Sequence, residues 1–188
     1  RGVETVADSR NLGLVVGSTR QDPDRQKQLL RAFRGQGVDG LIIAPIAAAE
    51  ADWRPFELSQ YGVVTLERPR TGSTVAWVGL DNVEGARLAF GHLLDLGHRK
   101  IAMVNGPPRV SWCAERREGA LRAVLERGLS PAETIIDVWV KDLTMEEGAA
   151  AIGPVLDEGD LTAVMCVNDL LALGALLAMR EREITVPS

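Results

Sequence analysis

Six short runs of almost unbroken apolar residues recur along the chain, and they constrain the fold more than any other feature. A strand that faces solvent on one side alternates apolar and polar residues, and these runs do not alternate. We therefore expect strands that are covered on both faces, as in parallel sheets. The runs span residues 12–17, 40–45, 62–67, 100–106, 134–140 and 162–167.

Segments with helical spacing of apolar residues lie between these runs. The first begins with Asp22, which can cap a helix, followed by Pro23, which suits the first helical position. In the fourth, Gly153 and Pro154 predict a kink or an early end. The last is apolar on nearly all sides, which indicates a helix that is deeply buried or shared with a partner. The expected helices cover residues 22–37, 82–97, 112–128, 144–159 and 168–183.

This alternation of strands and helices predicts an α/β fold with doubly wound parallel sheets and right-handed crossovers. One junction, "LLDLGHRKIAMVNGPP" at 93–108, contains one of the two histidines of the chain. Gly97 can take the left-handed conformation that ends a helix, and His98, Arg99 and Lys100 then lie near the negative end of the helix dipole. We interpret these residues as a helix end rather than as a chemical device.

A glycine motif of the GxGxxG type occurs at Gly35, Gly37 and Gly40. Dinucleotide binding requires this loop to follow a strand and to precede a helix, so that the helix N-terminus faces the phosphates. Here the order is reversed. We therefore expect an ordinary helix-to-strand turn and no nucleotide site.

Composition and residue spacing exclude several classes of function. The net charge of −5 and the pI near 5.1 argue against a chain whose main partner is nucleic acid, and acidic and basic residues alternate. Cys113 and Cys166 form no CxxC pair, which is typical of reduced thiols in a cytosolic protein, and no apolar run approaches 18 residues. His92 and His98 are badly spaced for a metal, and Ser111 lacks the glycines of a nucleophile elbow. We expect no cofactor, no metal and no enzyme activity.

Two segments carry side chains suited to ligand binding. In "NGPPRVSWCAERREG", a strand ends in a loop with Arg109 and Ser111, and a helix follows with Trp112 and Arg116. In open α/β sheets, ligands bind beyond the carboxyl ends of strands. The alternative is that the arginines are surface charges paired with nearby glutamates. In "CVND", Asn168 is expected either to cap the next helix or to present its amide to a ligand.

Beyond these features, the chain resembles the effector-binding domain of lactose/galactose-repressor (LacI/GalR) transcription regulators over nearly its whole length. The likeness is carried by four stretches that follow one another in the family's order and spacing. The parts "GHRKIA" and "NDLLALGAL" are more typical of the repressors than of the periplasmic sugar-binding proteins that share the fold. The stretches are "GVDGLIIAP", "VGLDNVEGARLAFGHLLDLGHRKIAMVNGP", "ERREGALRAVLERG" and "TAVMCVNDLLALGALLAM" with "ITVP".

The resemblance implies two doubly wound parallel-sheet lobes of the periplasmic-binding-protein-like type I fold, with an effector in the cleft between them. It places the crossing between lobes near Asp81 or just after the strand at 101–106, and the second position gives lobes 1–106 and 107–188. Leu143 occupies a position where relatives often carry an aromatic platform, so stacking on a sugar passes to Trp112. The expected effector-binding residues are Asp81, Arg109, Trp112, Arg116, Leu143 and Asn168.

The resemblance also implies partners. Leu173 and Leu177 match a helix that family members use for dimerisation, so a homodimer is expected. Operator DNA would be bound through a helix-turn-helix domain that this chain lacks, and both lobes are expected to be incomplete at the ends of the chain. The expected function is ligand sensing, for a carbohydrate or related small molecule, in a cytoplasmic bacterial transcription regulator. The alternatives are a periplasmic sugar-binding protein of an ABC transporter and a nucleotide-dependent α/β enzyme.

Overall fold

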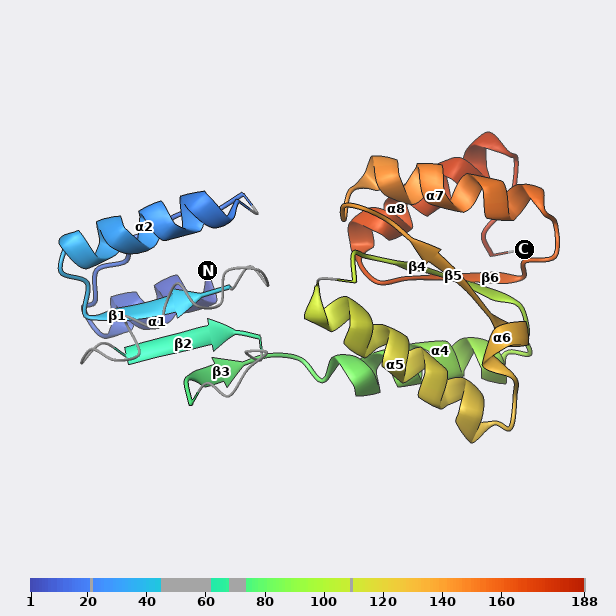
Figure 1. The fold of residues 1–188 in the computed structure, drawn as a ribbon, viewed down its shortest axis with the longest axis horizontal. Helices are drawn as coiled ribbons and strands as arrows, with labels where there is room; N and C mark the ends of the chain where they lie inside the picture. Colours follow the sequence, from blue (N-terminus) through green and yellow to red (C-terminus); the bar gives the residue numbers. More distant parts are fainter. Residues whose placement is uncertain (21, 45–61, 68–73, 109, 188) are drawn as a thin grey trace. The chain divides into compact units, whose positions relative to one another are not determined.

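The computed structural model describes residues 1–20, 22–44, 62–67, 74–108 and 110–187, and Figure 1 draws them as a ribbon. The chain divides into two compact units, Arg1–Gly79 and Leu80–Ser188. Each unit contains a parallel sheet with helices, which confirms the expected α/β class. The division lies near the first of the two expected crossing points. The expected boundary after residue 106 falls inside the second unit, because the strand that ends at Asn105 is the centre of that unit's sheet.

The first unit has a three-stranded parallel sheet in the order β1-β2-β3. Its core is small: Leu30 of the second helix packs with Leu41, Ile43 and Val63 of the sheet. The carboxylate of Asp22 caps that helix, as expected, by accepting hydrogen bonds from the main-chain N–H groups of the following turn. The elements are α1 (Gly2–Ser9), α2 (Pro23–Gly35), β1 (Gly40–Ile43), β2 (Gly62–Leu66) and β3 (Ala76–Val78).

The apolar run at 12–17 is not a strand, contrary to the expectation from its sequence. A strand needs a neighbour to accept and donate its main-chain hydrogen bonds. Among the described residues, β1 pairs only with β2, and the run joins neither sheet. Its side chains remain exposed, with Val16 at 80%. A strand that the sequence does not predict, β3, takes the third place in this sheet instead.

The second unit has a parallel sheet in the order β5-β4-β6, sandwiched between two pairs of helices. Helices α4 and α5 cover one face, and α7 and α8 cover the other (Figure 1). Strand β4 therefore has a neighbour on each side and a helix layer on each face, and all five of its residues are buried. The elements are α4 (Asn82–Asp95), β4 (Ile101–Asn105), α5 (Ser111–Glu126), α6 (Pro131–Thr134), β5 (Ile135–Trp139), α7 (Met145–Asp157), β6 (Ala163–Cys166) and α8 (Asp169–Glu181).

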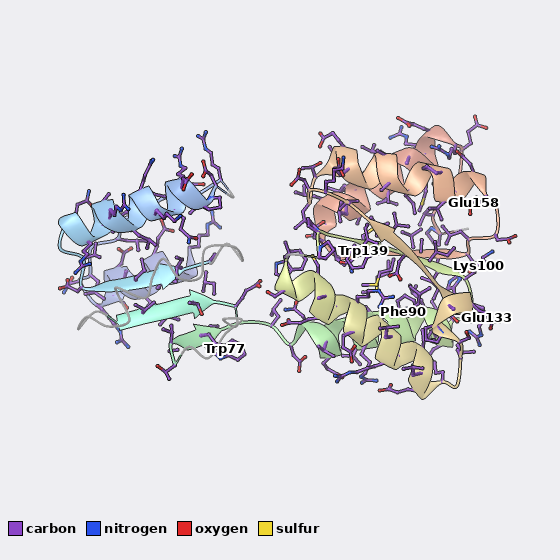
Figure 2. The ribbon with its side chains drawn as sticks, viewed as in Figure 1. Trp77, Phe90, Lys100, Glu133, Trp139 and Glu158 are labelled. Atoms are coloured by element: carbon purple, nitrogen blue, oxygen red, sulfur yellow. The ribbon has the colours of Figure 1, made fainter. Side chains whose placement is uncertain are left out.

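The core of this unit is larger than that of the first and is continuous through the sheet. Phe90 of α4 is fully buried and lies between its helix layer and the strands (Figure 2). Ile152 of α7 and Leu171 of α8 fill the opposite face. Burial of such a side chain contributes about 1.5–3 kcal/mol, so most of the stability of the described chain resides here.

In both helix pairs, a glycine of one helix lies directly against the main chain of the other. In α5, Gly119 lies against the main chain of α4, where a Cβ atom would be 2.8 Å from the nitrogen of Arg87 and would overlap the carbonyl of Val83. In α8, Gly174 lies against the main chain of α7, 2.8 Å from the nitrogen of Ala149 by the same measure. Only glycine allows two helices to approach this closely.

In each helix pair, an arginine eight residues after the glycine forms an ion pair with an aspartate of the other helix. The guanidinium of Arg127 donates to both carboxylate oxygens of Asp95, at 2.8 and 3.0 Å, and to the carbonyl of Ala123. Arg182 donates to both oxygens of Asp157, at 2.8 and 3.2 Å, and to the carbonyl of Ala178. The second unit therefore contains two matched helix–helix contacts on opposite faces of one sheet.

The helix ends follow most of the sequence-based expectations. Gly97 has a φ of +94°, and Arg99 donates to the carbonyl of Leu94 at 2.9 Å, which confirms that this stretch ends a helix. Gly37 has a φ of +71° in the turn between α2 and β1, as expected for a helix-to-strand connection. Helix α7 is not shortened at Pro154. Its packing against α8 outweighs the single main-chain hydrogen bond that proline removes.

Among the residues that the structure describes, no helix combines the length and the apolar character needed to cross a bilayer.

Candidate functional site

The strands of the second unit's sheet end side by side, and three loops begin at that edge. Trp139 is the last residue of β5 and lies at this edge, whereas Lys100 and Glu133 precede β4 and β5 at the opposite one (Figure 2). The main-chain ladder continues past the strand ends, because Val167 donates from its N–H to the carbonyl of Val104 at 3.0 Å. The carboxyl edge of a parallel sheet is where α/β proteins bind ligands.

Asn105, at the carboxyl end of β4, is fully buried, and both its side-chain nitrogen and its side-chain oxygen are hydrogen-bonded. Its side-chain amide donates to the carbonyl of Cys113 at 3.2 Å, and its side-chain oxygen accepts from the N–H of Gly106 at 2.9 Å. These bonds fix the start of α5 relative to the strand. Sequence reasoning did not identify this residue, although a lone asparagine that ends an apolar run is a signal for a buried polar anchor.

Arg116, in the second turn of α5, is held at this edge by three contacts. Its Nε donates to the side-chain oxygen of Asn82 at 3.0 Å, and its Nη1 donates to the main-chain carbonyl of Val167. Its guanidinium carbon lies 4.7 Å from the ring centroid of Trp112, one turn earlier on the same helix. Trp112 therefore stacks on Arg116, and Nη2 has no protein partner among the described residues.

Asn82, the first residue of α4, connects Arg116 to Glu115. Its side-chain nitrogen donates to the carboxylate of Glu115 at 2.9 Å, while its oxygen accepts from Arg116. All three side chains are partly buried. Sequence reasoning missed Asn82 and Glu115, because the two lie 33 residues apart and only the packing of α4 on α5 brings them together.

Asn168 lies next to the residue that Arg116 contacts. Its side-chain oxygen caps α8 by accepting from the N–H of Leu171 at 2.9 Å, and its amide nitrogen has no hydrogen-bond partner among the described residues. Because Arg116 donates to the carbonyl of Val167, the structure brings Arg116, Trp112 and the start of α8 to one place. These are three of the positions that the sequence singles out.

The other expected positions are placed differently. Leu143 packs inward against the core, near Gly106. Asp81 caps α4 by accepting from the N–H of Glu84 at 2.9 Å. Arg109 lies outside the described residues. The structure thus gives Leu143 and Asp81 local structural roles, while their contribution to ligand binding stays a prediction.

The alternative reading, surface arginines paired with neighbouring glutamates, does not hold for Arg116. Arg117 donates to both oxygens of Asp137 on β5, at 2.7 and 2.6 Å, and this pairing raises the pKa of the Arg117 guanidinium. Glu118 accepts from Arg122. In the described part of the chain, Arg116 is bound to an amide and a carbonyl rather than directly to a carboxylate.

This arrangement can bind a molecule rich in hydrogen-bond acceptors. The guanidinium of Arg116 offers only donors, which suit hydroxyl, carboxylate or phosphate oxygens. Cys166 is nearby at the end of β6, but burial raises the pKa of its thiol to about 11, so it is not a nucleophile at neutral pH. Within the described ranges, no group of three or more histidine, cysteine or acidic side chains could hold a metal ion.

Comparison with known proteins assigns the fold to a family. Residues 3–187 match the sequence profile of a family described as periplasmic binding proteins and sugar binding domain of LacI family. The chain belongs to this family. It is 30% identical over 188 residues to the HTH-type transcriptional regulator GalS of Salmonella typhimurium, and 30% identical over 191 residues to CelR of Thermobifida fusca. These alignments cover 100% and 99% of the chain but 55% of each regulator, so the chain spans about half their length.

Solved structures agree with this assignment. A LacI family regulator from Enterococcus faecium with bound ribose superposes with a TM-score of 0.83 and 24% identity, over 99% of this chain and 67% of that one. At this identity the likeness shows the fold alone. A periplasmic ribose ABC transporter protein from Conexibacter woesei superposes with a TM-score of 0.76 and 28% identity, over 98% of this chain and 63% of that one. The family therefore contains both regulators and transport proteins.

Proposed function

We propose that the chain is the effector-sensing part of a bacterial transcription regulator, and that its effector is a sugar or a related small molecule. The effector is bound at the carboxyl edge of the β5-β4-β6 sheet, and the chain catalyses no reaction. This proposal draws on membership of a family described as periplasmic binding proteins and sugar binding domain of LacI family, and on the regulators at 30% identity.

The observation that supports the site is that the protein holds the Arg116 guanidinium in one orientation. A guanidinium with two N–H groups held by the protein and one face covered by Trp112 has little freedom left, so binding a ligand costs it little further entropy. Its Nη2, which has no partner in the described part of the chain, can then donate two hydrogen bonds to oxygens of the ligand. Asn168, Trp112 and Arg109 are the residues we propose to act with it, and Leu143 and Asp81 would shape the site from its edges.

The test is a calorimetric binding screen against neutral monosaccharides, hexose phosphates and purine bases. We expect at least one sugar to bind, and Arg116→Ala to weaken that binding by about a hundred-fold, because a charged hydrogen-bond donor is lost. Arg122→Ala is the matched control, since Arg122 pairs on the surface with Glu118. If Arg116→Ala bound the sugar as tightly as the wild type, the site assignment would be wrong.

The whole protein would act as a cytoplasmic homodimer that binds operator DNA through a separate helix-turn-helix domain. Four exposed leucines on one side of α8 support the dimer: Leu170, Leu173, Leu176 and Leu177 are 45–50% exposed. Their buried neighbours on the other side of the helix, such as Leu171 and Ala175, pack on α7 and the sheet. Effector binding would favour one conformation of the dimer and thereby change its affinity for DNA.

A second candidate function, periplasmic sugar binding for an ABC transporter, is favoured by the match to the Conexibacter woesei protein. The two functions make different demands on the polypeptide encoded upstream of Arg1. Sequencing that region separates them, because a regulator has a helix-turn-helix domain there and a transport protein has a signal peptide. We expect the helix-turn-helix domain.

A further inference from the structure

We propose that Asn82 is a positioning residue for effector binding, which fixes the orientation of the Arg116 guanidinium before the effector arrives. The inference rests on the proposed function, since it concerns the same site. Asn82 is on a different helix from Arg116, and no contact with the effector is needed for this role. It acts through the hydrogen bond from the Nε of Arg116 to its side-chain oxygen, 3.0 Å long.

The bond to Nε constrains the guanidinium more than a bond to a terminal nitrogen would. Nε is the atom next to the side-chain stem, so holding it restricts the torsions that swing the planar group. The carbonyl of Val167 holds Nη1, and Trp112 covers one face. The hydrogen bonds to Asn82 and Val167 thus fix the plane of the guanidinium. The contact with the Trp112 ring prevents the group from moving toward that ring. The donors of Nη2 are then directed by the protein alone.

Glu115 gives the amide of Asn82 a single orientation. An asparagine side chain can rotate by 180° and exchange its donor and its acceptor. Here the carboxylate of Glu115 can only accept, and it lies 2.9 Å from the nitrogen of Asn82. The oxygen of Asn82 must therefore face Arg116, which can only donate. The three side chains form a chain of bonds in which each group has one allowed role.

The position of Asn82 on α4 adds rigidity. It is the first residue of a helix whose cap, Asp81, is hydrogen-bonded to Glu84, and α4 packs tightly on α5 through Gly119. The main chain at Asn82 is therefore held by the helix cap and by the packing of α4 on α5. A side chain held by a packed helix positions its partner better than one on a free loop.

The first test uses the protein without any sugar. Nitrogen-15 NMR measures rotation about the Nε–Cζ bond of Arg116 and the exchange of its Nε proton with water, and Arg116→Lys identifies the signal. We expect slow rotation and slow exchange in the wild type. Asn82→Ala should speed up both by about ten-fold or more, because a hydrogen bond to a charged group is lost.

Glu115→Gln provides a second variant that leaves Asn82 in place. Glutamine can donate as well as accept, so the amide of Asn82 loses its fixed orientation and Arg116 should again become more mobile. Glu118→Gln is the matched control on the same helix, since Glu118 pairs with Arg122, and it should leave the signals of Arg116 unchanged. Thermal unfolding of each variant checks that it folds.

The second test measures binding of D-ribose by calorimetry. We expect Asn82→Ala to weaken binding by about ten-fold, less than Arg116→Ala does, because the guanidinium is still present but no longer oriented. Two results overturn the inference: an Arg116 side chain as ordered in Asn82→Ala as in the wild type, or D-ribose binding that Arg116→Ala reduces and Asn82→Ala does not. If the wild type does not bind D-ribose, the NMR test decides alone, so failure of the proposed function is distinguished from failure of this inference.

Discussion

Gly119 of α5 lies so close to Val83 of α4 that a methyl group on Gly119 would overlap the main-chain carbonyl of Val83. We expect Gly119→Ala to destabilise the protein by about 1–3 kcal/mol, because neither main chain can move without disturbing the layer of helices. Chemical denaturation followed by circular dichroism measures this change. The same substitution at Gly174, in the matching helix pair, should have an effect of similar size.

The control for this prediction is Gly85→Ala in α4. Apart from its own helix, no atom of the described residues lies within 4 Å of the position that a Cβ would take at Gly85. Alanine favours a helix over glycine by about 1 kcal/mol, so this variant should be more stable than the wild type. Equal effects of Gly85→Ala and Gly119→Ala would mean that helix propensity, and not the close approach of two helices, governs Gly119.

A second prediction concerns acid and the pair formed by Asp157 and Arg182. The hydrogen bond from Arg182 lowers the pKa of Asp157 below its usual value of 3.8. The pair therefore stabilises the folded state above about pH 4, and this contribution is lost as the pH falls through the lowered pKa. Because Asp157 is largely exposed, the effect should be small.

Urea unfolding of the wild type, Asp157→Asn, Arg182→Gln and the double variant, at pH 6 and pH 2, measures the interaction as a double-mutant cycle. We expect a stabilising interaction at pH 6 that is weaker at pH 2, because part of the Asp157 population is then protonated. An interaction of the same size at both values would show that packing of the arginine stem, rather than its charge, holds the pair.

A third prediction concerns the thiol of Cys166. Burial raises its pKa from the usual 9.0 to about 11. At pH 8.5 the native protein should therefore react with iodoacetamide at Cys166 about a hundred times more slowly than the urea-unfolded chain does, because only the thiolate reacts. Mass spectrometry of the labelled peptide separates Cys166 from Cys113. Equal rates in the native and unfolded chains would contradict the burial of this thiol.

Stability depends on pH in opposite directions for the Cys166 thiol and for the Asp157 carboxylate. A raised pKa means that the folded state favours the neutral thiol, so its contribution is complete below pH 9 and is lost as the pH rises toward 11. Cys166→Ser removes the titrating group. Its unfolding free energy should depend less on pH between 9 and 11 than that of the wild type.

The proposed dimer gives a fourth prediction. Leu173→Glu, in the centre of the exposed face of α8, should shift the protein from dimer to monomer in sedimentation, because a buried carboxylate at an apolar interface is costly. Leu125→Glu is the control, since Leu125 is also exposed, at 61%, but lies on α5. A wild-type protein that sediments as a monomer at all concentrations would contradict the proposal.

Five of the six strands expected from the sequence are present, because a short, almost unbroken apolar run is a local signal for a buried strand. It was not sufficient for residues 12–17, whose sequence is equally suited to a strand but which pair with no described strand. A strand depends on its neighbours in the sheet, and these are distant in sequence. The short strand β3 escaped prediction for the same reason: its side chains are exposed, and pairing with β2 alone defines it.

The site was predicted in part. Arg116, Trp112 and Asn168 could be singled out because each lies just beyond a strand, in a loop or at a helix start. Asn82, Glu115 and Asn105 could not, because their roles depend on contacts between helices or inside the core. The expected lobe boundary after residue 106 stays a prediction. It differs from the division into compact units at Gly79, because a single sequence does not show that β4 pairs with β5 and β6 rather than with the earlier strands.

The burial of β4 on all sides affects how rarely this strand opens to solvent. The amide protons of Ile101–Asn105 can meet water only when both helix layers separate, so they should be among the last in the molecule to exchange. The first turn of α5, the helix that carries Arg116, is hydrogen-bonded to this strand through Asn105. Substitutions of exposed residues at the carboxyl edge of the sheet should therefore leave the folding of β4 beneath them unchanged.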